Sequence, residues 1–101
     1  MQVEQFNKIV DGTLGHCRDV LIVKAKEYAT DDRLHNFKKA ANLEDTTPEK
    51  ACVGMMAKYI VSVYDMVGSG ESYPDAVWDE KIGDSINYLL LLRALVEDGK
   101  K

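Results

Sequence analysis

The chain has 101 residues, the size of one compact domain with a single hydrophobic core, so we expect one domain over residues 1–101. Hydrophobic residues make up 46% and charged residues 30% of the sequence, which excludes an intrinsically disordered chain because enough apolar surface can be buried. The formal net charge is −4 and the lysines are scattered, which argues against binding of nucleic acid.

The cysteines and the N-terminus indicate where the protein works. Cys17 and Cys52 lie far apart with no CxxC spacing, and the sequence begins Met-Gln-Val-Glu, without the basic and apolar segments of a signal peptide. The apolar run from Leu89 to Leu92 is far shorter than the roughly 20 residues that cross a bilayer. We therefore expect a cytoplasmic protein with reduced thiols and no membrane segment.

The first helix is predicted over residues 3–28, because apolar residues recur there at steps of three and four on one face. Gly12 and Gly15 weaken the pattern, since each costs about 1 kcal/mol relative to alanine inside a helix. A kink, a later start near Thr13 and the close packing of a neighbouring helix are all compatible with these glycines.

A short second helix is predicted after a break at residues 29–32. The sequence Ala-Thr-Asp-Asp interrupts the periodicity there and offers side-chain acceptors that can cap the next helix. Leu34, Phe37 and Ala41 carry the apolar face of this helix, which is expected to end near Asn42.

The clearest helix start is at residues 46–49, Thr-Thr-Pro-Glu. A threonine cap, a proline in the first turn and an acidic residue at the positive end of the helix dipole agree there. The third helix is predicted over residues 48–67, and the Gly-Ser-Gly sequence at 68–70 stops it. The fourth opens at residues 72–75, Ser-Tyr-Pro-Asp, and continues to Gly99.

These elements predict an all-α fold, a small bundle of about four helices. Every linker is short, so successive helices are expected to pack as antiparallel or nearly antiparallel neighbours. The third and fourth helices carry apolar residues on a second face as well, more than so small a bundle can cover. A homo-oligomer is therefore expected.

The fourth helix carries the strongest candidate site. At about 100° per residue, several polar side chains share one stripe that continues into an apolar position, which predicts partial burial. These are Glu80, Asp84, Asn87 and Tyr88. Carboxylates one turn apart repel each other unless a cation or a shared proton offsets their charge. Magnesium, which prefers oxygen ligands, is a common cation in this role. Gly83 indicates the close approach of a neighbouring helix or a ligand.

The alternative for this stripe is that its carboxylates face water and form loose ion pairs with Lys81 and Lys58. Two further polar stripes could instead converge on it and supply phosphate-binding lysines and extra oxygen ligands. They consist of Lys58, Ser62 and Asp65 on the third helix, and of Lys24, Glu27 and Tyr28 at the end of the first. Each of these stripes taken alone is also typical of a solvent-exposed helix face.

The histidines and cysteines support less chemistry. Zinc is disfavoured because neither His16 nor His35 has a histidine or cysteine at metal-ligand spacing. Residues 35–37, His-Asn-Phe, could contact a base or a sugar, although a surface histidine beside a core phenylalanine is the commoner arrangement. Cys17 and Cys52 lie on apolar faces, which favours core packing over nucleophilic catalysis.

Residues 80–88, Glu-Lys-Ile-Gly-Asp-Ser-Ile-Asn-Tyr, and the preceding helix around Lys58 resemble a known family. They are similar to the small phage and prophage proteins related to the MazG-like all-α nucleotide pyrophosphohydrolases. The similarity spans residues 24–95 and includes a Lys-Tyr pair and an Asn-Phe pair, at Lys24, Tyr28, Asn36 and Phe37. In that superfamily an ExxE pair and an ExxD pair hold magnesium while an activated water cleaves the bond between the α and β phosphates.

The resemblance implies a MazG-like bundle that binds or hydrolyses a nucleoside triphosphate with magnesium. Glu80 and Asp84 would be the metal ligands, and Lys58 would join them in the catalytic set. The residues implied in substrate binding are Lys24, Tyr28, Asn36 and Asn87.

The metal motif is degenerate in this chain. The position three before Asp84 holds Lys81, and Tyr59 and Ser62 stand where the first acidic pair would be placed. This loss removes most of the negative charge that a magnesium site requires. Two hypotheses follow: a nucleotide pyrophosphohydrolase or related nucleotide binder, or a non-catalytic helical interaction protein of phage origin that retains the scaffold but not the metal site.

Overall fold

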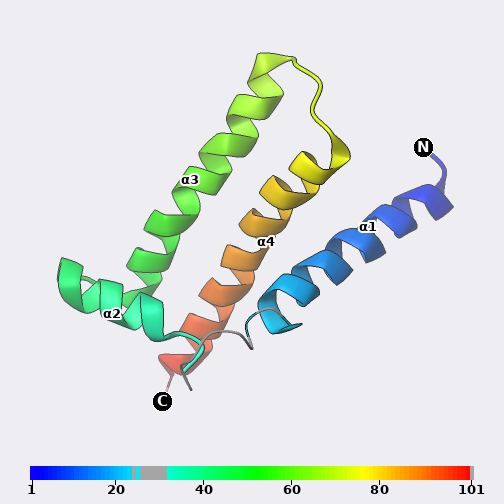
Figure 1. Cartoon of the computed structure of the whole chain (residues 1–101). Helices are drawn as coiled ribbons and strands as arrows, with labels where there is room; N and C mark the ends of the chain where they lie inside the picture. The colour runs from blue at the N-terminus through cyan, green and yellow to red at the C-terminus, as the bar shows by residue number, and fades with distance from the viewer. Residues whose placement is uncertain (24, 26–31, 101) are drawn as a thin grey trace.

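The computed structural model describes residues 1–23, 25 and 32–100 (Figure 1). Within these ranges the chain forms four α-helices and one π-helical segment, with no β-strand, so the all-α prediction is confirmed. The elements are α1 (Val3–Arg18), η1 (Asp19–Val23), α2 (His35–Glu44), α3 (Pro48–Ser69) and α4 (Asp75–Asp98).

The first helix begins where the sequence predicts but changes its winding early. It passes through Gly12 and Gly15 without a break, and a Cβ atom at either position would meet nothing within 4 Å. The α-helix ends at Arg18 and continues as the π-helix η1, so the expectation of one uniform helix through residue 23 is wrong. The β-branched residues of η1 disfavour regular α-helix. The rest of the predicted span, residues 24 and 26–28, lies outside the described residues.

The second helix follows the predicted break but is longer than predicted, and Leu34 at its N-cap position makes no side-chain cap. Asp32 Oδ1 accepts a hydrogen bond from the Leu34 amide at 2.9 Å, which fixes the turn before the helix rather than capping its first turn. The helix continues to Glu44, past the end expected near Asn42. It closes where Asp45 adopts the left-handed conformation, with φ 53°, and the following amide, of Thr46, donates to Ala41 O at 2.9 Å.

The long third and fourth helices start where the sequence indicates. Thr47 Oγ1 accepts from the Lys50 amide at 3.2 Å, and Pro48 is the first residue of α3. This helix ends at Ser69 because Gly70 supplies the left-handed turn, with φ 68°. Pro74 precedes the first residue of α4, which ends at Asp98.

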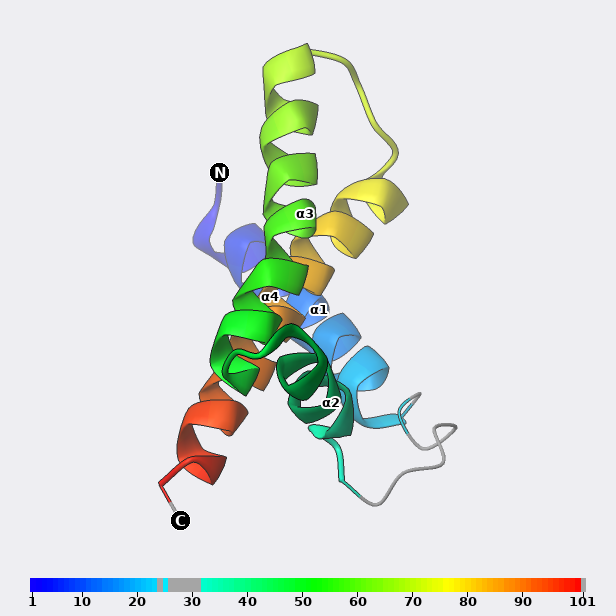
Figure 2. The same ribbon diagram turned by 90° about the vertical axis from the view of Figure 1, so that its left-hand side faces the viewer.

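The helices pack as an antiparallel pair with two additions. α3 and α4 lie side by side, α2 crosses the end of α3 where that helix begins, and α1 contacts α4 (Figures 1 and 2). A small core forms where α2, α3 and α4 meet. It contains Leu34, Phe37, Cys52 and Leu95, surrounded by Met55, Tyr88, Leu91 and Leu92. Within the described part of the chain, no helix combines the length and apolar character needed to span a bilayer.

Both cysteines belong to the packed interior, as predicted. Cys17 and Cys52 are 1% and 0% exposed. Their thiols lie 3.7 Å from the carbonyl oxygens of Gly83 and Tyr88, respectively, and burial raises the pKa of both thiols. Neither thiol therefore has the lowered pKa that marks a reactive cysteine.

Candidate ligand-binding cavity

A cavity of about 410 Å³ lies between η1, α2 and α4. This volume falls within the range of about 300–1,000 Å³ that small-molecule sites occupy. α4 lines it with Asp84, Asn87 and Tyr88, and the start of α2 contributes several polar side chains. Three of the residues predicted from the sequence for one site therefore share this cavity with Asn36, which was predicted for substrate binding.

Asn87 is the most unusual residue of the cavity wall. It is only 5% exposed, and its Oδ1 atom has no hydrogen-bond partner among the described residues. A buried polar atom left without a partner costs about 1–3 kcal/mol. A hydrogen-bond donor that reached this oxygen would remove the penalty.

Asp84 is half-buried on the same wall, one helical turn from Glu80. Burial raises the pKa of the Asp84 carboxyl group, and the negative charge of Glu80 raises it further. Lys81 and His16 act in the opposite direction and lower this pKa. The net rise shows that neighbouring cations do not fully offset burial of the carboxylate.

Gly83 allows α1 to approach α4 beside this carboxylate. A Cβ atom on Gly83 would lie 3.2 Å from His16 Cδ2 and 3.8 Å from Cys17 Sγ. The approach of a neighbouring helix, one of the two explanations predicted for this glycine, is therefore confirmed.

Tyr88 links the cavity to an aromatic cluster. Its ring stacks on Tyr59, with centroids 5.1 Å apart, and meets Phe37 edge-on at 6.2 Å. Burial, followed by the neighbouring Tyr59, raises the pKa of Tyr88 to about 12. The phenol is therefore neutral at physiological pH, and its ring gives the cavity an aromatic side.

The other residues predicted for the site lie elsewhere. Glu80 is exposed and does not line the cavity. Lys58 is exposed on α3, where its Nζ atom lies 5.0 Å from the centroid of the Tyr59 ring rather than at the cavity wall. Lys24 and Tyr28 lie outside the described residues, as does Glu27.

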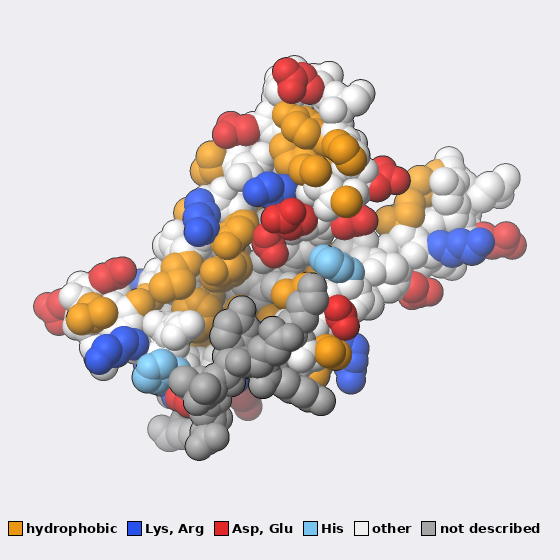
Figure 3. Space-filling view, viewed as in Figure 1, with side chains coloured by type: hydrophobic (Ala, Val, Ile, Leu, Met, Phe, Trp, Pro, Cys, Tyr) orange, Lys and Arg blue, Asp and Glu red, His pale blue; other side chains and the backbone are white. Residues whose placement is uncertain are grey.

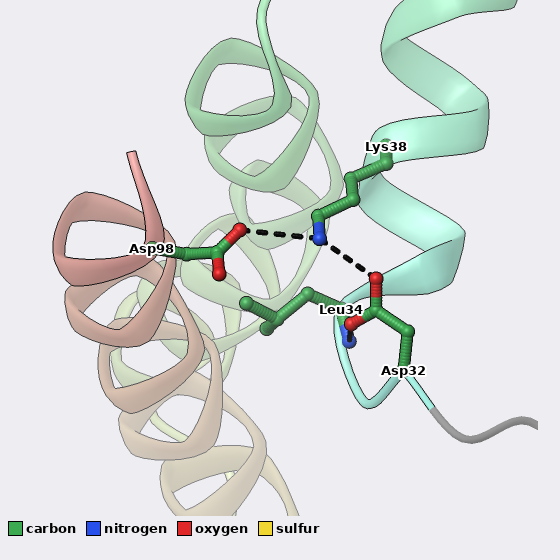
Figure 4. A network of polar contacts seen from close by, with 4 residues as sticks. All are labelled: Asp32, Leu34, Lys38 and Asp98. Atoms are coloured by element: carbon green, nitrogen blue, oxygen red, sulfur yellow. Dashed lines mark hydrogen bonds and ion pairs between the residues drawn. The ribbon is translucent and has the colours of Figure 1, made fainter. Parts of the chain in front are cut away.

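A polar network holds the start of α2 against the end of α4 (Figure 4). Lys38 Nζ lies 2.7 Å from Asp32 Oδ2 and 3.1 Å from Asp98 Oδ2. The bond to Lys38 lowers the pKa of Asp32, and the bonds to both carboxylates raise the pKa of Lys38. Because Asp32 also lines the cavity, the network positions one edge of it.

Sequence reasoning did not assign Arg33 to the site and preferred a surface role for His35. Both residues are exposed and line the cavity beside Asn36. The local sequence pattern carried no signal for them, because their place at the cavity depends on how α2 packs against the other helices. The Arg33 guanidinium gives this side of the cavity a positive charge, opposite in sign to Asp84.

The resemblance implied a magnesium ion held by two acidic pairs, and the described residues do not bring such a set together. No group of three or more His, Cys, Asp or Glu residues in the described ranges is placed to hold a metal ion. Asp84 lines the cavity, whereas Glu80 faces solvent. Magnesium prefers six oxygen ligands in near-octahedral geometry and usually draws one or two carboxylates from the protein with phosphate oxygens from the substrate.

Comparison of the chain with protein-family models, with curated proteins and with solved structures finds no match. The MazG-like affiliation accordingly stays a prediction from the motif in α4. Any function must be argued from the cavity and the surface of the molecule.

Proposed function

We propose that the protein binds a nucleotide-class ligand in the cavity between η1, α2 and α4. The observation that carries this proposal is the buried Oδ1 atom of Asn87, which finds no hydrogen-bond partner in the part of the chain that the structure describes. Buried polar atoms in folded proteins are nearly always paired, so an exception on a cavity wall indicates a partner that binds there. A base or a sugar hydroxyl supplies the required hydrogen-bond donor.

The other side chains of the cavity suit the remaining parts of a nucleotide. Tyr88 provides an aromatic side against which a base can pack. Arg33 and His35 line the exposed edge of the cavity. The guanidinium group of an arginine such as Arg33 can bind two phosphate oxygens at once. Asn36 adds an amide that can both donate and accept hydrogen bonds.

Binding, rather than hydrolysis, is the activity that these residues support. The cavity is lined by Asp84, whose pKa is raised, and by Asp32, which is paired with Lys38. A pyrophosphohydrolase of the kind implied by the resemblance holds magnesium with two acidic pairs. The hydrolytic hypothesis therefore requires ligands beyond the described residues.

Calorimetric titration with nucleoside mono-, di- and triphosphates, with and without magnesium, tests the proposal. At least one nucleotide should bind, and at 100 times its dissociation constant it should stabilise the fold by about 2.7 kcal/mol. Pyrophosphate release measured on the same panel separates binding from hydrolysis. If no nucleotide gives heat or raises the melting temperature, the proposal is wrong.

Asn87→Leu tests whether the buried oxygen of Asn87 takes part in ligand binding. It should weaken nucleotide binding at least tenfold, yet leave the ligand-free protein equally or more stable, because the unpaired oxygen is gone. Asn42→Leu, at an exposed position of α2, is the matched control and should bind like the wild type. Equal affinities of the wild type and Asn87→Leu would exclude Asn87 from the site.

A second candidate is a non-catalytic interaction protein that acts through self-association. A specific observation favours it: many large hydrophobic side chains are exposed on α1, α3 and α4. Figure 3 shows such apolar side chains, in orange, over the α3–α4 pair and along α1. The two candidate functions are compatible. The cavity and the exposed apolar surfaces lie partly on the same helices, but no residue belongs to both.

A further inference from the structure

The chain exposes more surface than a folded monomer of its size. Its accessible area is 7,610 Å², whereas a compact protein of 11.3 kDa exposes about 5,700 Å². The radius of gyration is 15.6 Å, compared with about 13 Å for a compact chain of 100 residues. A surplus of about 1,900 Å² is thus left uncovered by the chain's own packing.

The first uncovered surface is the apolar stripe of α1. Val3, Phe6, Val10 and Leu14 recur at helical spacing on the same side as Cys17. Only the end of this stripe is packed, because Cys17 is 1% exposed whereas Phe6 is 57% exposed. The N-terminal half of α1 extends away from the α3–α4 pair (Figure 1).

The second uncovered surface is an apolar groove of about 220 Å³ between α3 and α4. Its walls are almost entirely hydrophobic and include Ile60, Tyr64, Ile82 and Leu89. Tyr64 is 76% exposed, and Leu89 is 52% exposed. Ser85 is the one residue with a polar side chain other than Tyr64 in this lining, and its hydroxyl already donates to Lys81 O at 3.0 Å.

We propose that two copies of this chain form a symmetric dimer in which the α1 stripe of each copy occupies the α3–α4 groove of the other. Each chain carries both surfaces once, and a two-fold axis is the arrangement in which two copies use all four surfaces and the assembly closes rather than growing into a filament. If each copy buried its surplus, the interface would total about 3,800 Å², within the range of obligate homodimers. The proposal rests on the second candidate function and does not depend on nucleotide binding.

Sedimentation equilibrium of the whole chain tests this dimer. The wild type should sediment at twice the chain mass of 11.3 kDa. Phe6→Glu and Tyr64→Glu should each weaken dimerisation at least a hundredfold, because a charge would be buried in an apolar contact. Both side chains are exposed in the monomer, so circular dichroism should show an intact helical fold. Leu43→Glu, at a 77% exposed position of α2, is the control and should remain dimeric.

A cross-link tests the pairing itself. Phe6→Cys and Tyr64→Cys chains, mixed and treated with a short bismaleimide, should give a covalent heterodimer, while each variant alone should give far less. The native cysteines are buried and should not react. A monomeric wild type would overturn both this dimer and the self-association function. A wild-type dimer that survives both glutamate substitutions, or gives no Phe6→Cys to Tyr64→Cys cross-link, would overturn only the interface proposed.

Discussion

Individual polar residues of α4 are held in surroundings that do not fully satisfy them. Asn87 has a buried oxygen with no partner in residues 1–23, 25 and 32–100, and the carboxyl group of Asp84 has a pKa raised by burial and by Glu80. Such unmet requirements lower the stability of the folded chain, and they persist in proteins mainly where a ligand or a reaction uses them. The two residues are neighbours on one cavity wall, which makes a shared ligand the simplest explanation.

The pKa of Asp84 leads to a prediction about pH. A raised pKa means that the folded protein holds this proton more tightly than the unfolded chain, whose ordinary value is 3.8. The resulting stabilisation is complete below that value and is lost as the pH rises through the folded pKa. The free energy of unfolding of Asp84→Asn, relative to the wild type, should therefore increase from acidic toward neutral pH and then level off.

Urea unfolding of both proteins between pH 3 and pH 8 measures this difference. Asp79→Asn, at an exposed position of the same helix, is the control and should track the wild type at every pH. A difference between Asp84→Asn and the wild type that stays constant across the range would show that Asp84 titrates alike in the folded and unfolded chains.

At the scale of helices, the contact between α1 and α4 depends on a small residue. A Cβ atom on Gly83 would lie 3.2 Å from His16 Cδ2, so the His16 side chain would have to shift by a few tenths of an ångström, and the Cys17 thiol lies 3.7 Å from Gly83 O. The inherent cost of glycine inside a helix is about 1 kcal/mol, and it is offset here by the close packing of two helices. This contact also places η1 beside the cavity.

Substitution of glycine at two helical positions should have opposite effects. Gly83→Gln should lower the free energy of unfolding by about 1–3 kcal/mol, because its side chain would push α1 away from α4. Gly54→Gln, where a Cβ atom meets nothing within 4 Å, should raise it by up to about 1 kcal/mol. Chemical denaturation measures both, and a neutral Gly83→Gln would mean that the α1–α4 contact contributes little.

At the scale of the whole molecule, the fold has a small core and a large apolar surface. The buried hydrophobic residues are few for a chain of 101 residues, and much of α1 and of the α3–α4 groove is exposed. Exposed apolar patches of this extent are typical of interaction surfaces. A second copy that covers these patches would bury apolar surface that the small core of one chain leaves exposed.

The stability of the protein should therefore depend on its concentration. Because a dimer is favoured by mass action, the melting temperature of the wild type should rise by several degrees over a hundredfold increase in concentration. Phe6→Glu should melt at a lower temperature that does not change with concentration. Calorimetry at several concentrations measures this, and a constant melting temperature for the wild type would argue for a stable monomer.

Local sequence determined most of the secondary structure, since helix starts depend on neighbouring residues. The Thr47-Pro48 start of α3 and the glycine that ends α3 could be predicted because caps act over a few residues. The periodic apolar faces also indicated the burial of both cysteines, because helical periodicity can be seen in the local sequence. The stripe in α4 was partly predictable: Asp84 and Asn87 share a cavity, whereas Glu80 faces solvent.

Only the tertiary structure decided which residues surround the cavity. Helical spacing places Asp84 and Asn87 on one face, but it does not say that Arg33 and His35 lie across from them or that Lys58 lies over Tyr59. Those relationships depend on how α2 crosses α3 and how closely α1 approaches Gly83, which are long-range packing outcomes. The π-helical turn of η1 and the uncovered half of α1 likewise follow from the path of the whole chain, because a helical pattern specifies a face but not its partner.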